Sequence, residues 1–178
     1  MDKKTGSPVP AARAGAVLGD SASIDDLLLA ALSAHNRNSF DEAIALYSRI
    51  LELQPKNSIR SLIYKHRGMA KFAQSQYHDA IADFGNALEY DRKSYKAAYY
   101  QGVVYSVLKQ YAEAIDDFTH SLVINPYQSF CLFRRGQAYF HIGDFPQALS
   151  DCEASLALEP KNETVRRFKS LLQDKLKM

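Results

Sequence analysis

Residues 95–128 read YKAAYYQGVVYSVLKQYAEAIDDFTHSLVINPYQ, and the block that follows, 129–162, reads SFCLFRRGQAYFHIGDFPQALSDCEASLALEPKN. The two stretches align without a gap, and the columns that agree include small residues and a proline: Gly102 with Gly136, Ala114 with Ala148, and Pro126 with Pro160. A fixed interval of this length indicates one structural unit that is repeated along the chain.

The repeat continues toward the N-terminus. Gly68 and Ala80 precede Gly102 and Ala114 by the same interval, whereas the interval from Ala43 to Ala80 is longer. Three extra residues at about 58 to 60 lengthen that junction by nearly one helical turn. The sequence therefore predicts four units, the first of them set off from the other three.

Each repeated alanine is followed by an apolar stripe with the period of a helix. The stripes, at i, i+3 and i+7, are Ile81/Phe84/Leu88, Ile115/Phe118/Leu122 and Leu149/Cys152/Leu156. A glycine inside a helix costs about 1 kcal/mol relative to alanine, so its recurrence indicates helices that cross closely. We predict an all-α chain with helices at about 24–36, 41–53, 59–74, 78–90, 95–108, 112–124, 129–142 and 146–158.

The two ends of the chain differ from the repeats. Residues 1–22 are rich in Gly, Pro, Ala and Ser and lack a hydrophobic period, so we expect a flexible tail. Ser23 and Asp26 have the spacing of a capping box at the start of the first helix. Residues 163–178 are predicted to form a ninth helix that caps the stack, with Val165, Phe168 and Leu172 on its apolar face.

Composition and motifs exclude several classes of protein. The chain is 47% hydrophobic and 24% charged, and no apolar run reaches the roughly 20 residues that a membrane helix needs. Phosphate-binding glycine loops, nucleophile elbows and metal-binding motifs are absent from the sequence, so we expect no enzyme activity, no cofactor and no metal. Cys131 and Cys152 are expected to be free buried thiols, which favours a reducing compartment and a cytoplasmic location.

These columns resemble the tetratricopeptide repeat family, whose 34-residue helix-turn-helix unit carries W-x2-L-G-x2-Y, A-x3-F and P. The third unit matches through Ala98, Gly102, Tyr105, Ala114, Phe118 and Pro126, and the match covers residues 24 to 162. The departures lie in the bulky columns, such as Cys152 in the place of phenylalanine. The resemblance implies a right-handed α-solenoid of four units, at about 24–57, 61–94, 95–128 and 129–162, within a domain of residues 23–162.

In that family the first helix of each unit lines a concave groove and the second forms the convex back. The resemblance implies that a peptide-binding groove is lined by Lys65, Met69, Phe72, Lys96, Tyr99, Val103, Phe130, Phe133, Arg134, Gln137 and His141. By the same register Asp25, Leu28, Leu32, His35, Leu62, Ser106 and Phe140 face it too. The resemblance also implies that Arg67 pairs with Asp83 and Arg135 with Asp151 as part of the scaffold.

The predicted groove wall is apolar and aromatic, and a large apolar surface in water usually has a partner. The alternative is that some of these aromatic side chains pack against the capping helix or against a second copy of the chain. The sequence leaves both interpretations open for any single residue.

Charge is segregated along the chain although the net charge is only +2. Stretches 53–78, 92–112 and 118–143 hold eleven Lys and Arg and no acid, whereas 79–91, 113–117 and 144–159 hold eleven Asp and Glu and no base. If the first helices face inward, the groove is basic and would attract an acidic partner.

The sequence therefore predicts a non-enzymatic scaffold that binds a peptide segment of a partner protein. One alternative is a structural subunit of a homo- or hetero-oligomer, whose oligomeric state the sequence does not give. Another is a co-chaperone that binds the EEVD tail of a heat-shock chaperone. Family members that do so use a clamp of Lys, Asn and Arg side chains, and aligned on units two to four this chain supplies Lys65 and Arg134 but has Met69, Tyr100 and Phe130 in place of Asn, Asn and Lys. Nucleic-acid binding is not expected, because an acidic back and a net charge of +2 give little attraction for phosphate.

Overall fold

The computed structural model describes residues 22–177, and the predicted tail of residues 1–22 lies outside this range except for Ala22. The described part of the chain is helical and contains no strand. Its helices are α2 (Ile24–Asn36), α3 (Phe40–Glu52), α4 (Asn57–Ala73), α5 (Tyr77–Tyr90), α6 (Tyr95–Val107), α7 (Tyr111–Ile124), α8 (Ser129–His141), α9 (Phe145–Leu158) and α10 (Glu163–Leu176).

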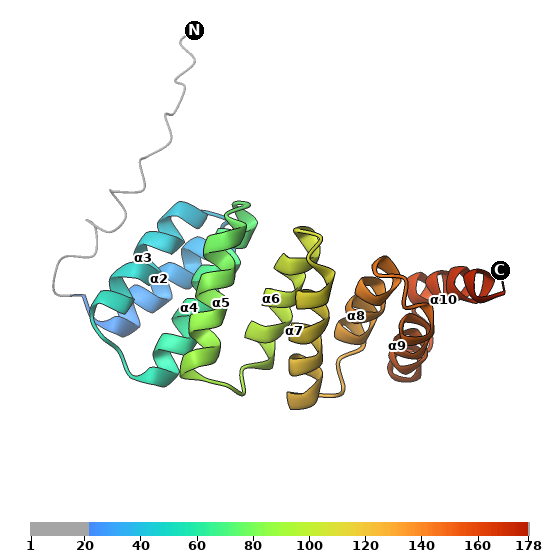
Figure 1. Cartoon of the computed structure of the whole chain (residues 1–178). Coiled ribbons are helices and arrows are strands. Elements are labelled where there is room, and N and C mark those ends of the chain that lie inside the picture. The colour runs from blue at the N-terminus through green and yellow to red at the C-terminus, as the bar shows by residue number, and fades with distance from the viewer. Residues whose placement is uncertain (1–21, 178) are drawn as a thin grey trace, which may run out of the picture.

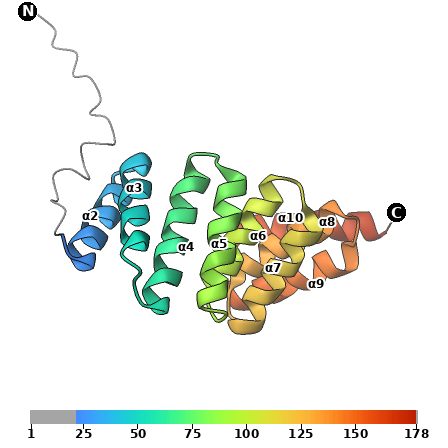
Figure 2. The same cartoon turned by 60° about the vertical axis from the view of Figure 1, so that its left-hand side comes forward.

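The helices form a row of hairpins that runs from one end of the molecule to the other (Figure 1). Each helix packs against the next one in the chain, and the tightest pairs are α2 with α3, α4 with α5, α6 with α7, and α8 with α9. The view in Figure 2 shows the same order from α2 to α9, and α10 packs against α9. The predicted all-α architecture of stacked helical hairpins is confirmed.

Local sequence explains where several helices begin. The Ser23 hydroxyl accepts from the Asp26 backbone N–H while the Asp26 carboxylate accepts from Ser23, so the predicted capping box is present. Asp144 accepts from the Gln147 backbone N–H and Pro146 lies in the first turn of α9, where its missing N–H costs nothing. Asn162 caps α10 in the same way through the Val165 N–H.

The turn inside each hairpin contains one residue with a left-handed backbone. These residues are Asn38, Ser75, Lys109 and Gly143, with φ of 60°, 62°, 60° and 85°. The last three are separated by the interval of the repeat, so the turn geometry recurs with the unit. Only the fourth turn uses glycine, the residue that adopts this conformation without a Cβ penalty, which is why composition alone did not reveal the pattern.

The small-residue columns lie where the two helices of a unit cross. A Cβ atom on Gly102 would lie 2.9 Å from ring carbons of Phe118, and one on Gly68 would lie 3.0 Å from the Phe84 ring. Ala80, Ala114 and Ala148 are completely buried. The close crossing predicted from the glycine and alanine columns is therefore observed.

In each of two units, a partly buried ion pair joins the first helix to the second. The Arg67 guanidinium donates to both oxygens of Asp83 at 2.8 and 2.7 Å, and Arg135 donates to Asp151 at 2.9 and 2.7 Å. Lys71 adds a second cation 2.9 Å from Asp83. The pairs that the family resemblance implied are thus present, and each is a bidentate, charge-assisted contact.

The third unit keeps the carboxylate of this column but not the arginine. Asp117 stands one repeat after Asp83, whereas Gln101 takes the corresponding place of Arg67 and donates instead to the Ile81 carbonyl at 3.3 Å. The Oδ2 atom of Asp117 is buried and accepts no hydrogen bond from any residue that the structure describes. Burial, together with the neighbouring Asp116 charge, raises the pKa of Asp117 to about 7.

The C-terminal helix closes the end of the stack. Val165 and Leu172 of α10 are fully buried, and Phe168 packs among side chains of α8 and α9. Cys131 and Cys152 are buried and unpaired, as predicted, and burial raises the pKa of their thiols to about 12 and about 11. Over residues 22–177, no helix has the length and apolarity required to cross a membrane.

Candidate functional site

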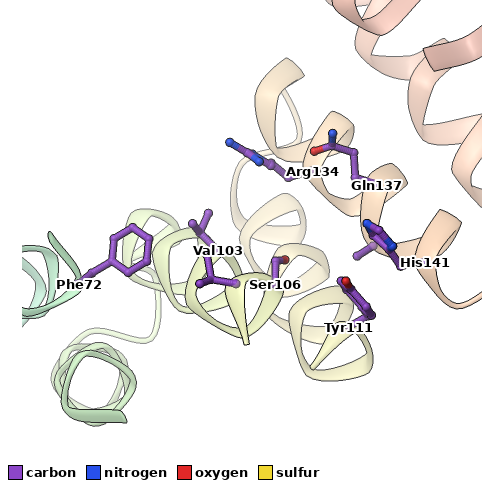
Figure 3. A pocket seen from close by; sticks show the side chains of 9 residues that line it. Phe72, Val103, Ser106, Tyr111, Arg134, Gln137 and His141 are labelled. Atoms are coloured by element: carbon purple, nitrogen blue, oxygen red, sulfur yellow. The ribbon is translucent and has the colours of Figure 1, made fainter. Parts of the chain in front are cut away.

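The first helices of the units lie side by side on one face of the row. Beyond sequential neighbours, α4 contacts α6 and α6 contacts α8. Between the C-terminal halves of these helices lies a hollow of about 400 Å³. Its lining comes from α4, α6, α8 and the start of α7 and consists of Phe72, Val103, Ser106, Val107, Tyr111, Arg134, Gln137, Ala138 and His141. Figure 3 shows these side chains.

The wall of this hollow is apolar on one side and polar on the other. Phe72 of α4 and Val103 of α6 form the apolar side, whereas the polar ends of Arg134 and Gln137 extend from α8 (Figure 3). The His141 and Tyr111 rings stack in nearly parallel planes with centroids 4.4 Å apart. Among the described residues that line the hollow there is no carboxylate, so Arg134 gives it a positive charge.

A second basic position lies on α4 and α6, outside the hollow. Lys65 and Lys96 are close enough to repel each other: burial and then the Lys96 charge lower the pKa of Lys65, while Asp91 partly offsets them. Among residues 22–177 neither lysine lies within ion-pair distance of a carboxylate. Lys96 does approach the Tyr95 ring, at 5.9 Å from its centroid.

Aromatic side chains also gather on α6 and α8 near Arg134. The Tyr99 and Phe130 rings meet edge to face at 4.8 Å, and Tyr99 also packs against Phe118. Burial raises the pKa of the Tyr99 phenol, and the nearby Arg134 guanidinium partly offsets this shift. Phe130 keeps about half of its surface exposed. Arg134 therefore lies near an aromatic surface that is partly accessible.

Three residues expected to face the groove also make contacts within the chain. The Phe133 and Phe140 rings contact the Phe168 ring of the capping helix at 5.7 and 5.4 Å. Met69 packs against the cluster of Ala80, Phe84 and Val104. For Phe133 and Phe140 the structure thus supplies the capping-helix contact that the sequence left open as an alternative.

Residues 67–129 and 129–162 match two models of the tetratricopeptide repeat. Together these matches span residues 67–162, which is more than half of the chain. The chain belongs to the tetratricopeptide repeat family. The first predicted unit precedes the matched range, but α2 and α3 form a helical hairpin like those of the recognised tetratricopeptide repeats.

Solved tetratricopeptide repeat structures resemble this chain closely in fold. The first such domain of Spaghetti (RPAP3), bound to the HSP90 peptide SRMEEVD, is 26% identical, with a TM-score of 0.66 over 68% of this chain and 96% of that one. A MamA RS-1 structure is 18% identical, with a TM-score of 0.79 over 89% and 86% of the two chains. The Arabidopsis OM64 domain is 22% identical, with a TM-score of 0.64 over 67% and 98%. No curated protein matches the chain.

Of the predicted groove residues, the hollow brings together Phe72, Val103, Ser106, Arg134, Gln137 and His141. Sequence reasoning missed Val107, Tyr111 and Ala138 as lining residues. Tyr111 begins the second helix of its tetratricopeptide repeat, a helix assigned to the convex back, yet its ring stacks on His141 at the end of α8 in the next unit. The column Tyr77, Tyr111 and Phe145 was a signal that could have identified it, because it places a ring at every hairpin turn.

Proposed function

We propose that this tetratricopeptide repeat protein is a non-enzymatic scaffold that holds a peptide segment of a partner protein along its inner face. The observation that carries the proposal is the hollow lined by α4, α6, α7 and α8, which has apolar and aromatic side chains on its wall and Arg134 at its polar side. Lysines without ion-pair partners among residues 22–177 would gain attraction when an acidic segment binds. Peptide binding by a 26% identical domain, that of RPAP3, supports the same class of function.

The proposed contact residues are Lys65, Met69, Phe72, Lys96, Tyr99, Val103, Phe130, Arg134, Gln137 and His141. We leave out Phe133, because the capping helix already covers one edge of its ring. Two buried free thiols favour a reducing compartment, and we propose a cytoplasmic location for this reason.

A pull-down from the source cell tests the proposal. The double variant Lys65→Glu with Lys96→Glu reverses two charges on the inner face, and Arg92→Glu with Lys93→Glu makes the same change in the exposed α5–α6 loop. We expect the wild type and the loop variant to recover the same partners, and the inner-face variant to lose them. Equal recovery by all three proteins at low salt would show that the basic inner face does not bind the partner.

A second candidate is binding of a chaperone tail, which the RPAP3 structure with its HSP90 peptide favours. Against it, the side chains where the resemblance requires amides are Met69 and Tyr100, and the Tyr100 ring stacks on Phe84 at 5.9 Å. Neither can supply the amide donors that hold a carboxylate. Isothermal titration with the peptide SRMEEVD separates the candidates: a micromolar affinity would favour the chaperone tail, and no heat of binding would exclude it.

The structural-subunit alternative has one observation in its favour, since Leu171 and Leu176 on α10 are exposed. Light scattering at increasing protein concentration tests it. A constant monomer mass would leave the scaffold function as the better account.

A further inference from the structure

We propose that the occupant of the inner face is an internal peptide segment with one bulky apolar side chain seated in the hollow and acidic residues on either side of it. This inference rests on the proposed function and specifies the chemistry of the partner. The hollow supplies the apolar anchor site, Arg134 supplies the adjacent charge, and the Lys65 and Lys96 pair supplies a second charge at a distance that the helices fix.

The size and lining of the hollow point to one large side chain. A volume of about 400 Å³ is near the lower end for ligand pockets, and much of the wall is made by Phe72, Val103, Val107 and the Tyr111 ring. Val107 is 46% exposed although it is aliphatic. An aromatic or long aliphatic side chain placed here would remove that surface from water, which is the dominant source of affinity in such sites.

The polar side of the hollow determines what flanks the anchor. Arg134 is the only arginine or lysine among the described lining residues, which include no carboxylate. An aspartate or glutamate beside the anchor would reach this guanidinium and form a charge-assisted hydrogen bond. A basic residue at the same place would meet unopposed repulsion, because the described lining offers it no carboxylate.

The second basic position sets the spacing of a further acid. Lys96 and Val103 are two helical turns apart on α6, which corresponds to about 10 Å along the helix axis. About three residues of extended chain span this distance. Lys65 lies near Lys96, and the two cations repel each other in the free protein. An acidic residue about three positions from the anchor would meet both cations and relieve this repulsion.

The segment is internal because its recognition needs no terminal carboxylate. The clamp positions on α4 and α6 carry Met69 and Tyr100, which offer no amide donors to a chain end. Side-chain carboxylates held by Arg134 and the two lysines supply the charge complementarity instead.

Fluorescence anisotropy with a labelled nine-residue peptide tests this inference. The probe has a central phenylalanine with glutamates beside it and three residues away on both sides, an acetylated N-terminus and an amidated C-terminus. We expect binding that weakens about tenfold or more when the phenylalanine is replaced by alanine or the glutamates by lysine, the loss typical of a central anchor or charge pair. A peptide with a free C-terminal carboxylate is expected to bind no more tightly than the amidated one.

Matched protein variants locate the site. Val107→Arg fills the hollow, whereas Val123→Arg makes the same change on α7, where Val123 is 77% exposed. Arg134→Glu reverses the charge at the hollow, and Arg167→Glu does so on exposed α10. The two hollow variants are expected to lose binding and the two controls to retain it, with circular dichroism showing that all four fold.

Three outcomes would overturn the inference: equal binding of the alanine probe, equal binding by Val107→Arg, or at least tenfold tighter binding of the free-carboxylate peptide. If no probe binds while the Lys65 and Lys96 double variant still loses partners in the pull-down, the segment chemistry is wrong and the scaffold function stands. If the pull-down is also unaffected, both fail.

Discussion

The carboxylate without an arginine in the third unit gives a quantitative prediction about stability. The variant Asp117→Asn replaces an acid whose pKa is raised from 3.8 to about 7 by a neutral side chain of the same shape. Because the folded protein binds this proton more tightly than the unfolded chain, the folded state loses stability as the pH rises from about 4 to about 7. The variant is therefore expected to be more stable than the wild type above pH 7 and equally stable near pH 4.

The magnitude follows from the shift and from the surroundings of Asp117. The pKa of Asp117 rises by about three, and each pKa unit corresponds to about 1.4 kcal/mol of folding free energy. The full effect would therefore be roughly 4 kcal/mol. Asp117 keeps some contact with solvent, which screens the charge, so we expect about 1 to 2 kcal/mol at pH 8. Gln101→Arg should give a gain of similar sign, because it restores the partner that Asp83 and Asp151 possess.

Urea unfolding followed by circular dichroism at pH 5 and pH 8 measures both variants. Glu113→Gln is the control, since Glu113 is an exposed carboxylate of the same helix that does not contribute to the raised pKa of Asp117, and its loss should change stability by a few tenths of a kcal/mol. An Asp117→Asn protein no more stable than wild type at pH 8, or one with the same dependence on pH, would refute the reasoning.

Three further changes test the fold. Asp83→Ala should destabilise the chain by about 3 to 5 kcal/mol in urea unfolding, because it leaves the Arg67 guanidinium without its buried partner, whereas loss of the Asp117 carboxylate should not. Gly102→Ala should destabilise by about 1 to 3 kcal/mol through its clash with the facing ring, while Gly85→Ala should stabilise by about 0.5 to 1 kcal/mol, since its added Cβ meets nothing closer than 3.7 Å. Burial and neighbouring positive charges lower the pKa of His66 to about 4, so stability should fall as the pH drops from 6.5 toward 4, and His66→Gln should remove about 1 kcal/mol of that loss at pH 5.

Each of these changes has a result that would contradict it. An Asp83→Ala protein within about 1 kcal/mol of wild type would show that the ion pair does not fasten the unit. Equal effects of alanine at positions 85 and 102 would mean that helix propensity outweighs packing. An unchanged slope of stability against pH below 6.5 in His66→Gln would exclude this imidazole as the titrating group.

Most of the architecture could be predicted from the sequence, because the repeat places small residues at every helix crossing. Gly102 and Ala114 lie where the axes of two helices approach most closely. The small residues recur in this column even where the bulky positions of the repeat differ from unit to unit. The helix starts near Phe40, Tyr77, Tyr111 and Phe145 were each predicted one residue late, since the helical signal there began with the residue after the aromatic.

The inner face was harder to predict. Register identifies which side of a helix faces inward, but it does not show that Phe168 of α10 reaches back to contact Phe133. Nor does it show that the Tyr111 ring extends from a second helix to His141. Both contacts join different units or a unit and the capping helix, and the sequence pattern of a single unit contains no information about them.

The irregular first junction shows how this architecture absorbs changes in length. Helix α4 begins at Asn57, ahead of the position that corresponds to the start of α6, so the insertion is accommodated as about one additional turn at the end of a helix. The extra turn packs against the end of α5, where Arg60 reaches the Tyr90 ring and hydroxyl, and the crossing at Gly68 is undisturbed. A junction between two repeats can therefore gain a whole helical turn without any change in how the helices pack. A search that requires a fixed spacing between repeats will miss a repeat that is shifted by such an insertion.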